Sequence, residues 1–343
     1  VASSDFDLFA PSFGTEWVKY FGRHIGPAPT DFTAPNPPSG PVIAYFLKSA
    51  LTSGSAAKAD SKSSKGPVTI KISDSEGNPV ATIHGPGQAG VNRIAWNMDY
   101  AGVKLPKFLK QQMHFFGQGP TGPIVLPGTY KVSVTAGSHT ASQTVTVRAA
   151  PRLHLSLAMQ RSALKTGLQL RNATNAMLEM LGSTHTMLDS LDDTIAATAD
   201  AAQGSARAEA HTAALALKKR LGGFAMKLYN PKLQLSAPED ILHHISRFGM
   251  RLFGLYRSLG SLGPNQAPNA EQSGVIAKTE AELKQYLDTF NGPLHQAVVD
   301  YNRKAYAAGV ATLAVGKPVR VAPIMGKTAS PAAVSAAQSG ALH

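Results

Sequence analysis

The chain has 343 residues, of which 43% are hydrophobic and 16% charged, a composition typical of a folded protein with room for two ordinary domains. It contains no cysteine, which excludes disulfides, thiolate nucleophiles and thiolate metal ligands. The formal net charge is +12, but the basic residues are spread along the chain, with one dense run at 218–220, so we expect no nucleic-acid binding. No apolar run of about 18 residues occurs, so we expect no transmembrane segment.

Residues 1–41 are predicted to form an extended lead-in. Aromatic residues, Trp17 among them, are scattered there between Gly and Pro without a period. Prolines near its end fix φ and disfavour a helix. We therefore expect the rings to pack on another surface, and Trp17 is a candidate partner or glycan contact.

Residues 42–150 are predicted to form an antiparallel Ig-like β-sandwich. Val68, Ile70 and Ile72 alternate with polar residues, and the same alternation recurs at 128–134 and 144–147. A period of two is typical of strands with one buried face. The strand at 42–48 has apolar residues on both faces, so we expect it to be covered on both sides.

The segment 85–90 matches the pattern G-x-G-x-x-G of dinucleotide-binding loops. Such a loop needs a helix after it, so that backbone N–H groups face the pyrophosphate. Here a proline interrupts the pattern and the strand-like segment ending at Trp96 follows. We therefore interpret 85–90 as a turn and Trp96 as a core residue, with sugar stacking by Trp96 or Trp17 as an alternative.

The segment 101–126 is long, aromatic and bears several Gly and Pro residues. Loops of that length are often functional. Phe108, Phe115 and Phe116 are therefore candidate partner or glycan contacts.

Residues 151–308 are predicted to form an antiparallel four-helix bundle, because apolar residues recur there at intervals of three, four and seven. The first stripe predicts one long helix, or two in line with a break near Gly182. The third follows a capping box at 236–239, and the fourth is broken at Gly292 and Pro293. Asn172 matches a glycosylation acceptor, although its place inside a predicted helix argues against that role.

Residues 309–343 are predicted to form an extended low-complexity tail, with three basic residues and no acidic one. A tail of this composition should be disordered by itself. We expect neighbouring chains to hold it in place, and hence an assembly.

The sequence contains few groups arranged for chemistry. Asp240, His243 and His244 are spaced so that a helix could bring them toward one metal ion, but no third histidine has a motif relation to them. Neither H-E-x-x-H nor G-x-S-x-G occurs, and the adjacent acids Asp192 and Asp193 project apart, unlike a glycosidase pair. We predict no catalytic residue, cofactor or metal in this chain.

Several short motifs occur in a fixed order: D-L-F-A-P at 7–11, N-P-P-x-G-x-V-I-x-Y-x-L-K at 36–48, I-x-D-x-x-G-x-x-V at 72–80, G-x-N-R-I-A-W-N at 90–97, P-G-x-Y-x-V at 127–132 and V-R-A-A-P-R at 147–152. Together they resemble the C-terminal region of large secreted bacterial proteins with sortilin-like, BNR-repeat β-propellers, often labelled glycosyl hydrolases. The predicted sandwich is also similar to the Ig-like module of flagellar hook-capping proteins.

The resemblance implies an exported protein that is periplasmic, or else extracellular or at the cell surface. A propeller would precede residue 1, so any hydrolase activity of the family would have no residues in this chain. We expect a non-catalytic accessory and assembly region, a structural scaffold whose partners are neighbouring chains or a propeller domain. The alternatives are the C-terminal part of a propeller glycoside hydrolase-like enzyme, or a carbohydrate-binding module.

Overall fold

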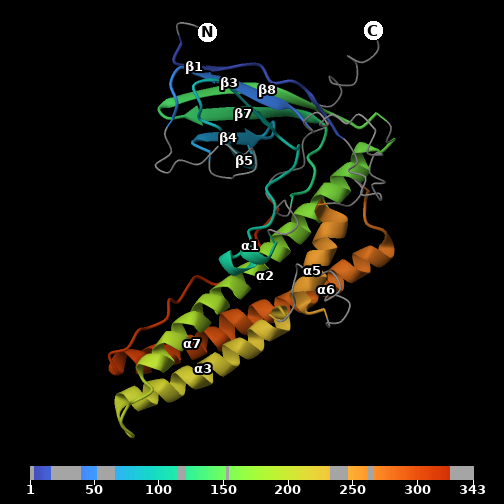
Figure 1. Ribbon diagram of the computed structural model, residues 1–343. Helices are drawn as coiled ribbons and strands as arrows, with labels where there is room; N and C mark the ends of the chain where they lie inside the picture. The colour runs from blue at the N-terminus through green and yellow to red at the C-terminus, as the bar shows by residue number, and fades with distance from the viewer. Residues whose placement is uncertain are drawn as a thin grey trace, which may run out of the picture.

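The computed structural model describes residues 4–16, 40–51, 66–113, 121–151, 154–231, 246–261 and 266–324. The fold is α+β, with two β-sheets at one end and a rod of helices extending from them (Figure 1). Within the described residues, none of the helices combines the length and apolar character needed to cross a bilayer.

The two sheets contain eight strands within the part of the chain that the structure describes. The larger sheet has the order β2-β8-β7-β4-β5, built from β2 (Gly14–Thr15), β8 (His139–Arg148), β7 (Gly128–Ala136), β4 (Val68–Ser73) and β5 (Pro79–Gly85). The smaller sheet has the order β1-β3-β6, built from β1 (Phe6–Leu8), β3 (Val42–Leu47) and β6 (Gly90–Ala95). Two short strands of the lead-in, β1 and β2, thus pair with the smaller and the larger sheet respectively.

The buried faces of the two sheets share one apolar core. Val68, Ile70 and Ile72 are buried and their neighbours are not, as the alternation predicts. Trp96 is 1% exposed, its ring meets that of Tyr130 edge-on at 5.3 Å, and its indole N–H donates to the Asp99 carbonyl. In β3 only one face is fully buried, so the predicted covering of both faces is not found.

The prediction of an antiparallel Ig-like β-sandwich is wrong. β2 pairs in parallel with β8, which makes the larger sheet mixed, and this sheet curls into a half-barrel. The smaller sheet is antiparallel. The sequence pattern does not reveal this because β1 and β2 have three and two residues, too few to show a period.

The helices differ widely in length. They are α1 (Lys107–Met113), α2 (Leu157–Ala197), α3 (Ala206–Leu228), α5 (Phe248–Leu255), η2 (Tyr256–Ser261), α6 (Ala270–Thr289), η3 (Phe290–Leu294) and α7 (His295–Ala307). α2 alone has 41 residues and is not broken at Gly182. At Gly292 and Pro293 the chain widens into the π-helical turn η3 and continues as α7. The prediction of a four-helix bundle is therefore wrong.

The loop between β6 and β7 attaches the sheets to the rod. The Asn175 side chain accepts a hydrogen bond from the Lys104 backbone at 2.8 Å, and the Tyr256 hydroxyl donates to the Thr121 carbonyl at 2.6 Å. Further along, α2 and η2 approach at Gly167 and Gly260, where an added Cβ on Gly167 would lie 3.2 Å from the Gly260 Cα and 2.9 Å from the Pro123 ring. This loop, predicted to contact partners, thus contacts the chain's own helices.

We predict opposite effects for two Gly→Ala changes in helices. Gly167→Ala should lower the free energy of unfolding by about 1–3 kcal/mol, because the new methyl group overlaps backbone and a rigid ring. Gly223→Ala in α3, where the added Cβ meets nothing within 4 Å, should raise it by about 0.5–1 kcal/mol. Urea denaturation of both variants measures these changes, and a stable Gly167→Ala variant would contradict the close approach.

Candidate functional site

A segment that we call the strap, residues 310–324, runs back along the rod from the end of α7 (Figure 1). α7 ends in a Schellman motif, in which the Val310 N–H donates to the Ala305 carbonyl and the Gly309 N–H to that of Tyr306. Gly309 has φ = 63°, a left-handed conformation that favours glycine. This reversal directs the strap onto the rod.

Three asparagine side chains hold the strap by its backbone. Asn302 donates to the Leu313 carbonyl at 2.9 Å and accepts from the Leu313 N–H at 2.8 Å. Asn291 makes the same pair of bonds with Val319, at 2.8 and 2.9 Å. Asn172 donates to the carbonyls of Ala322 and Pro323 at 3.0 and 3.2 Å. These six bonds recognise extended backbone, whatever the strap side chains are.

Two aliphatic side chains anchor the strap where the asparagines hold it. Leu313 is 5% exposed and Val319 is 4% exposed, and both belong to the helical core. The five residues between them, 314–318, are all exposed. The Tyr301 hydroxyl adds a bond of 3.3 Å to the Ala311 carbonyl. The strap is therefore fixed at separate points along its length.

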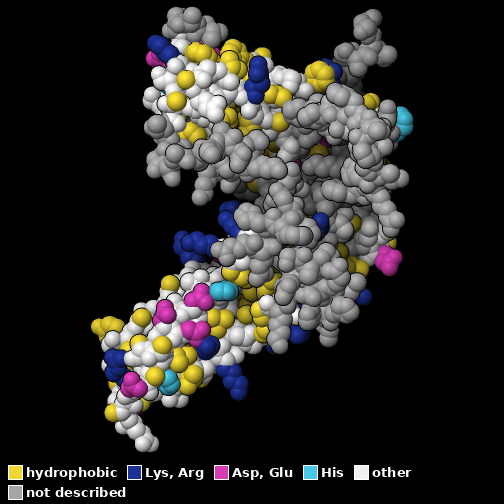
Figure 2. Space-filling model, in the orientation of Figure 1, with side chains coloured by type: hydrophobic (Ala, Val, Ile, Leu, Met, Phe, Trp, Pro, Cys, Tyr) yellow, Lys and Arg dark blue, Asp and Glu magenta, His cyan; other side chains and the backbone are white. Residues whose placement is uncertain are grey.

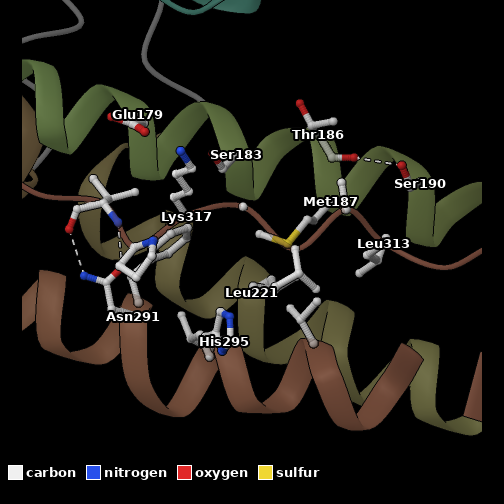
Figure 3. Close-up of a pocket in the computed structure, with 18 residues that line it drawn as sticks. Glu179, Ser183, Thr186, Met187, Ser190, Leu221, Asn291, His295, Leu313 and Lys317 are labelled. Carbon is white, nitrogen blue, oxygen red and sulfur yellow. Dashed lines mark hydrogen bonds between the residues drawn. The ribbon is translucent and has the colours of Figure 1, made fainter. Parts of the chain in front are cut away.

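A pocket of about 350 Å³ lies under the strap between the two anchors (Figure 3). Apolar side chains from α2, α3, η3, α7 and the strap line it, namely Met187, Leu221, Phe290, Leu294, Val298 and Leu313. Its size and mainly apolar walls are typical of a binding site.

Polar side chains of the pocket come mainly from α2, with Asn291 from η3, His295 from α7 and Lys317 from the strap. Figure 3 shows the Lys317 side chain extending from the strap toward α2, between Glu179 and Ser183. Among the described residues no ion pair to Lys317 is formed, and no group of three His, Asp or Glu residues is placed to hold a metal ion. The arrangement can donate and accept hydrogen bonds and bury apolar groups, which suits binding.

The residues singled out from the sequence are mostly not in this site. Trp17, Phe115, Phe116, Asp240, His243 and His244 lie outside the described residues. Phe108 is partly buried and stacks on His185 with ring centroids 4.3 Å apart. The buried Trp96 ring cannot stack on a sugar.

Sequence reasoning missed the clamping role of the asparagines. Asn172 drew attention only as a glycosylation motif, yet it is 5% exposed and bonded to the strap. Asn291 and Asn302 are spaced eleven residues apart, three helical turns, which places them on one side of η3 and α7. That spacing was the available signal, but polar residues on a helix usually face solvent.

The G-x-G-x-x-G segment is a turn, as predicted. Gly85 ends β5 and Gly90 begins β6, so a strand follows the pattern where a dinucleotide site would need a helix. The Asn92 side chain holds the turn by donating to the carbonyls of Gln88 and Gly90 and accepting from the Gln88 N–H. The segment therefore has a structural role.

Glu16 is a buried carboxylate next to the short parallel strand β2. It is 2% exposed, and its Oε1 has no hydrogen-bond partner, while the Ala150 backbone N–H donates to the carboxylate. Burial raises the pKa of Glu16 to about 7, because the charged form loses its hydration, and the bond from Ala150 offsets only part of this.

Comparison of the sequence with models of known protein families and with curated proteins gives no significant match. The motifs that carry the sequence resemblance have structural roles here. Asp74 accepts bonds from the Glu76 and Asn78 backbones in the β4–β5 turn, where Gly77 has φ = 84°. The Tyr130 hydroxyl donates to the Leu126 carbonyl. These residues shape turns and core.

We predict that Glu16 makes stability fall with rising pH. A carboxyl group whose pKa is raised on folding binds more protons in the folded than in the unfolded state, so the free energy of unfolding decreases from about pH 4.5 through about pH 7 and then levels. Glu16→Gln should be more stable than the unchanged chain above pH 7, by roughly 2–3 kcal/mol. Urea titrations of both proteins at pH 5 and pH 8 test this. If the difference in unfolding free energy between Glu16→Gln and the unchanged chain is the same at both pH values, the prediction is contradicted.

We also predict that the asparagine bonds control access to the strap. Asn291→Ala should speed trypsin cleavage after Arg320 about tenfold, because losing two backbone bonds at about 0.5–1.5 kcal/mol each eases local opening. Gln296→Ala is the matched control, since the Gln296 side chain on α7 bonds to Asp300 and, among the described residues, not to the strap. Similar cleavage rates in both variants would show that Asn291 does not hold the strap.

Proposed function

We propose that this chain is a non-catalytic assembly module of an exported bacterial protein, and that its rod acts by binding extended polypeptide. The observation behind this proposal is the set of six hydrogen bonds from Asn172, Asn291 and Asn302 to the strap backbone. In this proposal the strap occupies the groove in the same way as a bound partner segment would. Corresponding segments of partner proteins are the proposed ligands.

Backbone recognition suits an assembly protein. A groove that bonds N–H and C=O groups accepts many sequences, and pockets for a few side chains supply specificity. Here the specificity comes from the sites of Leu313 and Val319, six residues apart. A fully buried aliphatic side chain contributes about 1.5–3 kcal/mol, which corresponds to modest affinity once ordering costs are subtracted.

The surface and the sequence motifs support the same proposal. Figure 2 shows Lys and Arg side chains interspersed with Asp and Glu on the visible face of the rod. Such a mixed surface fits protein partners better than nucleic acid, which favours a basic stripe. The resemblance to C-terminal regions of secreted propeller proteins supports export and a place in a larger complex.

The test uses the full chain with its own strap weakened by Leu313→Ser and Val319→Ser. A fluorescent peptide of residues 309–324 should bind this variant saturably in the micromolar to millimolar range, as measured by anisotropy. Adding Asn291→Ala and Asn302→Ala should weaken binding at least tenfold. A peptide with Leu313 and Val319 exchanged for serine is the matched control.

Absence of saturable binding would contradict the proposal, provided that circular dichroism shows the variant to be folded. Equal binding of the control peptide would also contradict it, because the two apolar anchors would then play no part.

A further inference from the structure

We infer that the strap exchanges between two copies of this chain, each strap filling the groove of the other copy. The exchanged copy would supply Leu313, Lys317 and Val319 to the pocket, so the site of each rod would be completed by its partner. This inference rests on the proposed function, since it requires the groove to bind a strap in trans.

The first argument is that one residue forms the hinge. The strap reverses direction at Gly309, which has φ = 63°, while Ala308 before it is still right-handed, with φ = −86° and ψ = −3°. If Gly309 leaves the left-handed region, the two bonds of the Schellman motif open and the strap leaves the end of α7 pointing away from its own rod. Exchange therefore needs a change at a single position.

The second argument is that the strap is attached at points and not along its length. Residues 314–318 are exposed and pass over a pocket of about 350 Å³ that no side chain fills. The strap can therefore be released by freeing two apolar anchors, three asparagine contacts and the Tyr301 bond to the Ala311 carbonyl, without disrupting a helix or a sheet. A segment released in this way exposes the complete groove to another strap.

The third argument concerns the occupant. Asn302 and Asn291 bind the backbone of an extended segment at two residues, and at both of these positions, 313 and 319, the strap has an aliphatic side chain. A second copy supplies this segment with identical chemistry, so the exchanged contacts equal the original ones. Tyr306, three residues before the hinge and 82% exposed, lies where the ends of the two rods would meet.

The experiment exploits the absence of cysteine from the full chain. One tagged copy has Asn302→Cys and a second, differently tagged copy has Leu313→Cys, while Asn172 and Asn291 are unchanged in both. After mixing and mild oxidation, a disulfide between the two copies should form, because position 302 of one copy meets position 313 of the other only when the strap of one lies in the groove of the other, in the place that its own strap occupies here. The control pair is Gln296→Cys in one copy with Leu313→Cys in the other. Gln296 lies on the same helix as Asn302 but is exposed.

The hinge gives a second readout. A Cβ added at Gly309 would meet nothing within 4 Å, so a Gly309→Val change is directed at the left-handed backbone conformation. It should raise the yield of the disulfide between copies roughly fivefold or more, because a β-branched residue disfavours that conformation.

The inference is overturned if the pair with cysteines at 302 and 313 gives no more disulfide between copies than the pair with cysteines at 296 and 313, whether position 309 is Gly or Val. This outcome counts only if a single chain with cysteines at both 302 and 313 still forms an internal disulfide. If the strap peptide nevertheless binds in trans, the groove binds extended segments and only the exchange is wrong. If the peptide also fails to bind, the proposed function fails with it.

Discussion

The length of α2 is the constraint on which the rest of the structure depends. A helix of 41 residues is about 60 Å long, and among the described residues several elements share the covering of its buried side chains. α5 and η2 cover it near its start and α3 near its end, while α7 and the strap lie beside the part lined by Glu179 to Ser190. The strap is therefore part of the cover that this helix requires.

The strap can fill this place only because its backbone polar groups are satisfied. An extended segment laid on helices has no strand beside it to bond its N–H and C=O groups, and leaving them unpaired where side chains are buried is costly. Asn302 and Asn291 supply those bonds at the two residues whose side chains are buried, Leu313 and Val319. Between them the exposed residues can bond to water. Burial and hydrogen bonding thus coincide along the strap.

The strands were the most predictable part of the fold. The alternation of Val68, Ile70 and Ile72 identifies β4 and its buried face, and the leucines from 157 onward identify α2. The parallel pairing of β2 was not predictable, because two residues show no period and their partner lies more than 130 residues away. Nor was the continuation through Pro293, where a π-helical turn replaces the expected break.

The candidate site was the least predictable part. The small residues and prolines after 309, with no acidic residue among them, predict disorder or support by neighbouring chains, yet residues 310–324 are held by the chain's own rod. The reason is that Asn172, distant in sequence, and the pair Asn291 and Asn302 converge on this segment only after α2 has packed beside η3 and α7. A composition argument cannot include partners that only the fold brings together.

Amide hydrogen exchange of the unmodified chain, measured by NMR across residues 310–324, tests the central claim most directly. The claim predicts slow exchange at Leu313 and Val319, whose N–H groups donate to asparagine, and fast exchange from Ala314 to Lys317 between them. Uniformly fast exchange throughout the segment would show that the strap does not lie in the groove.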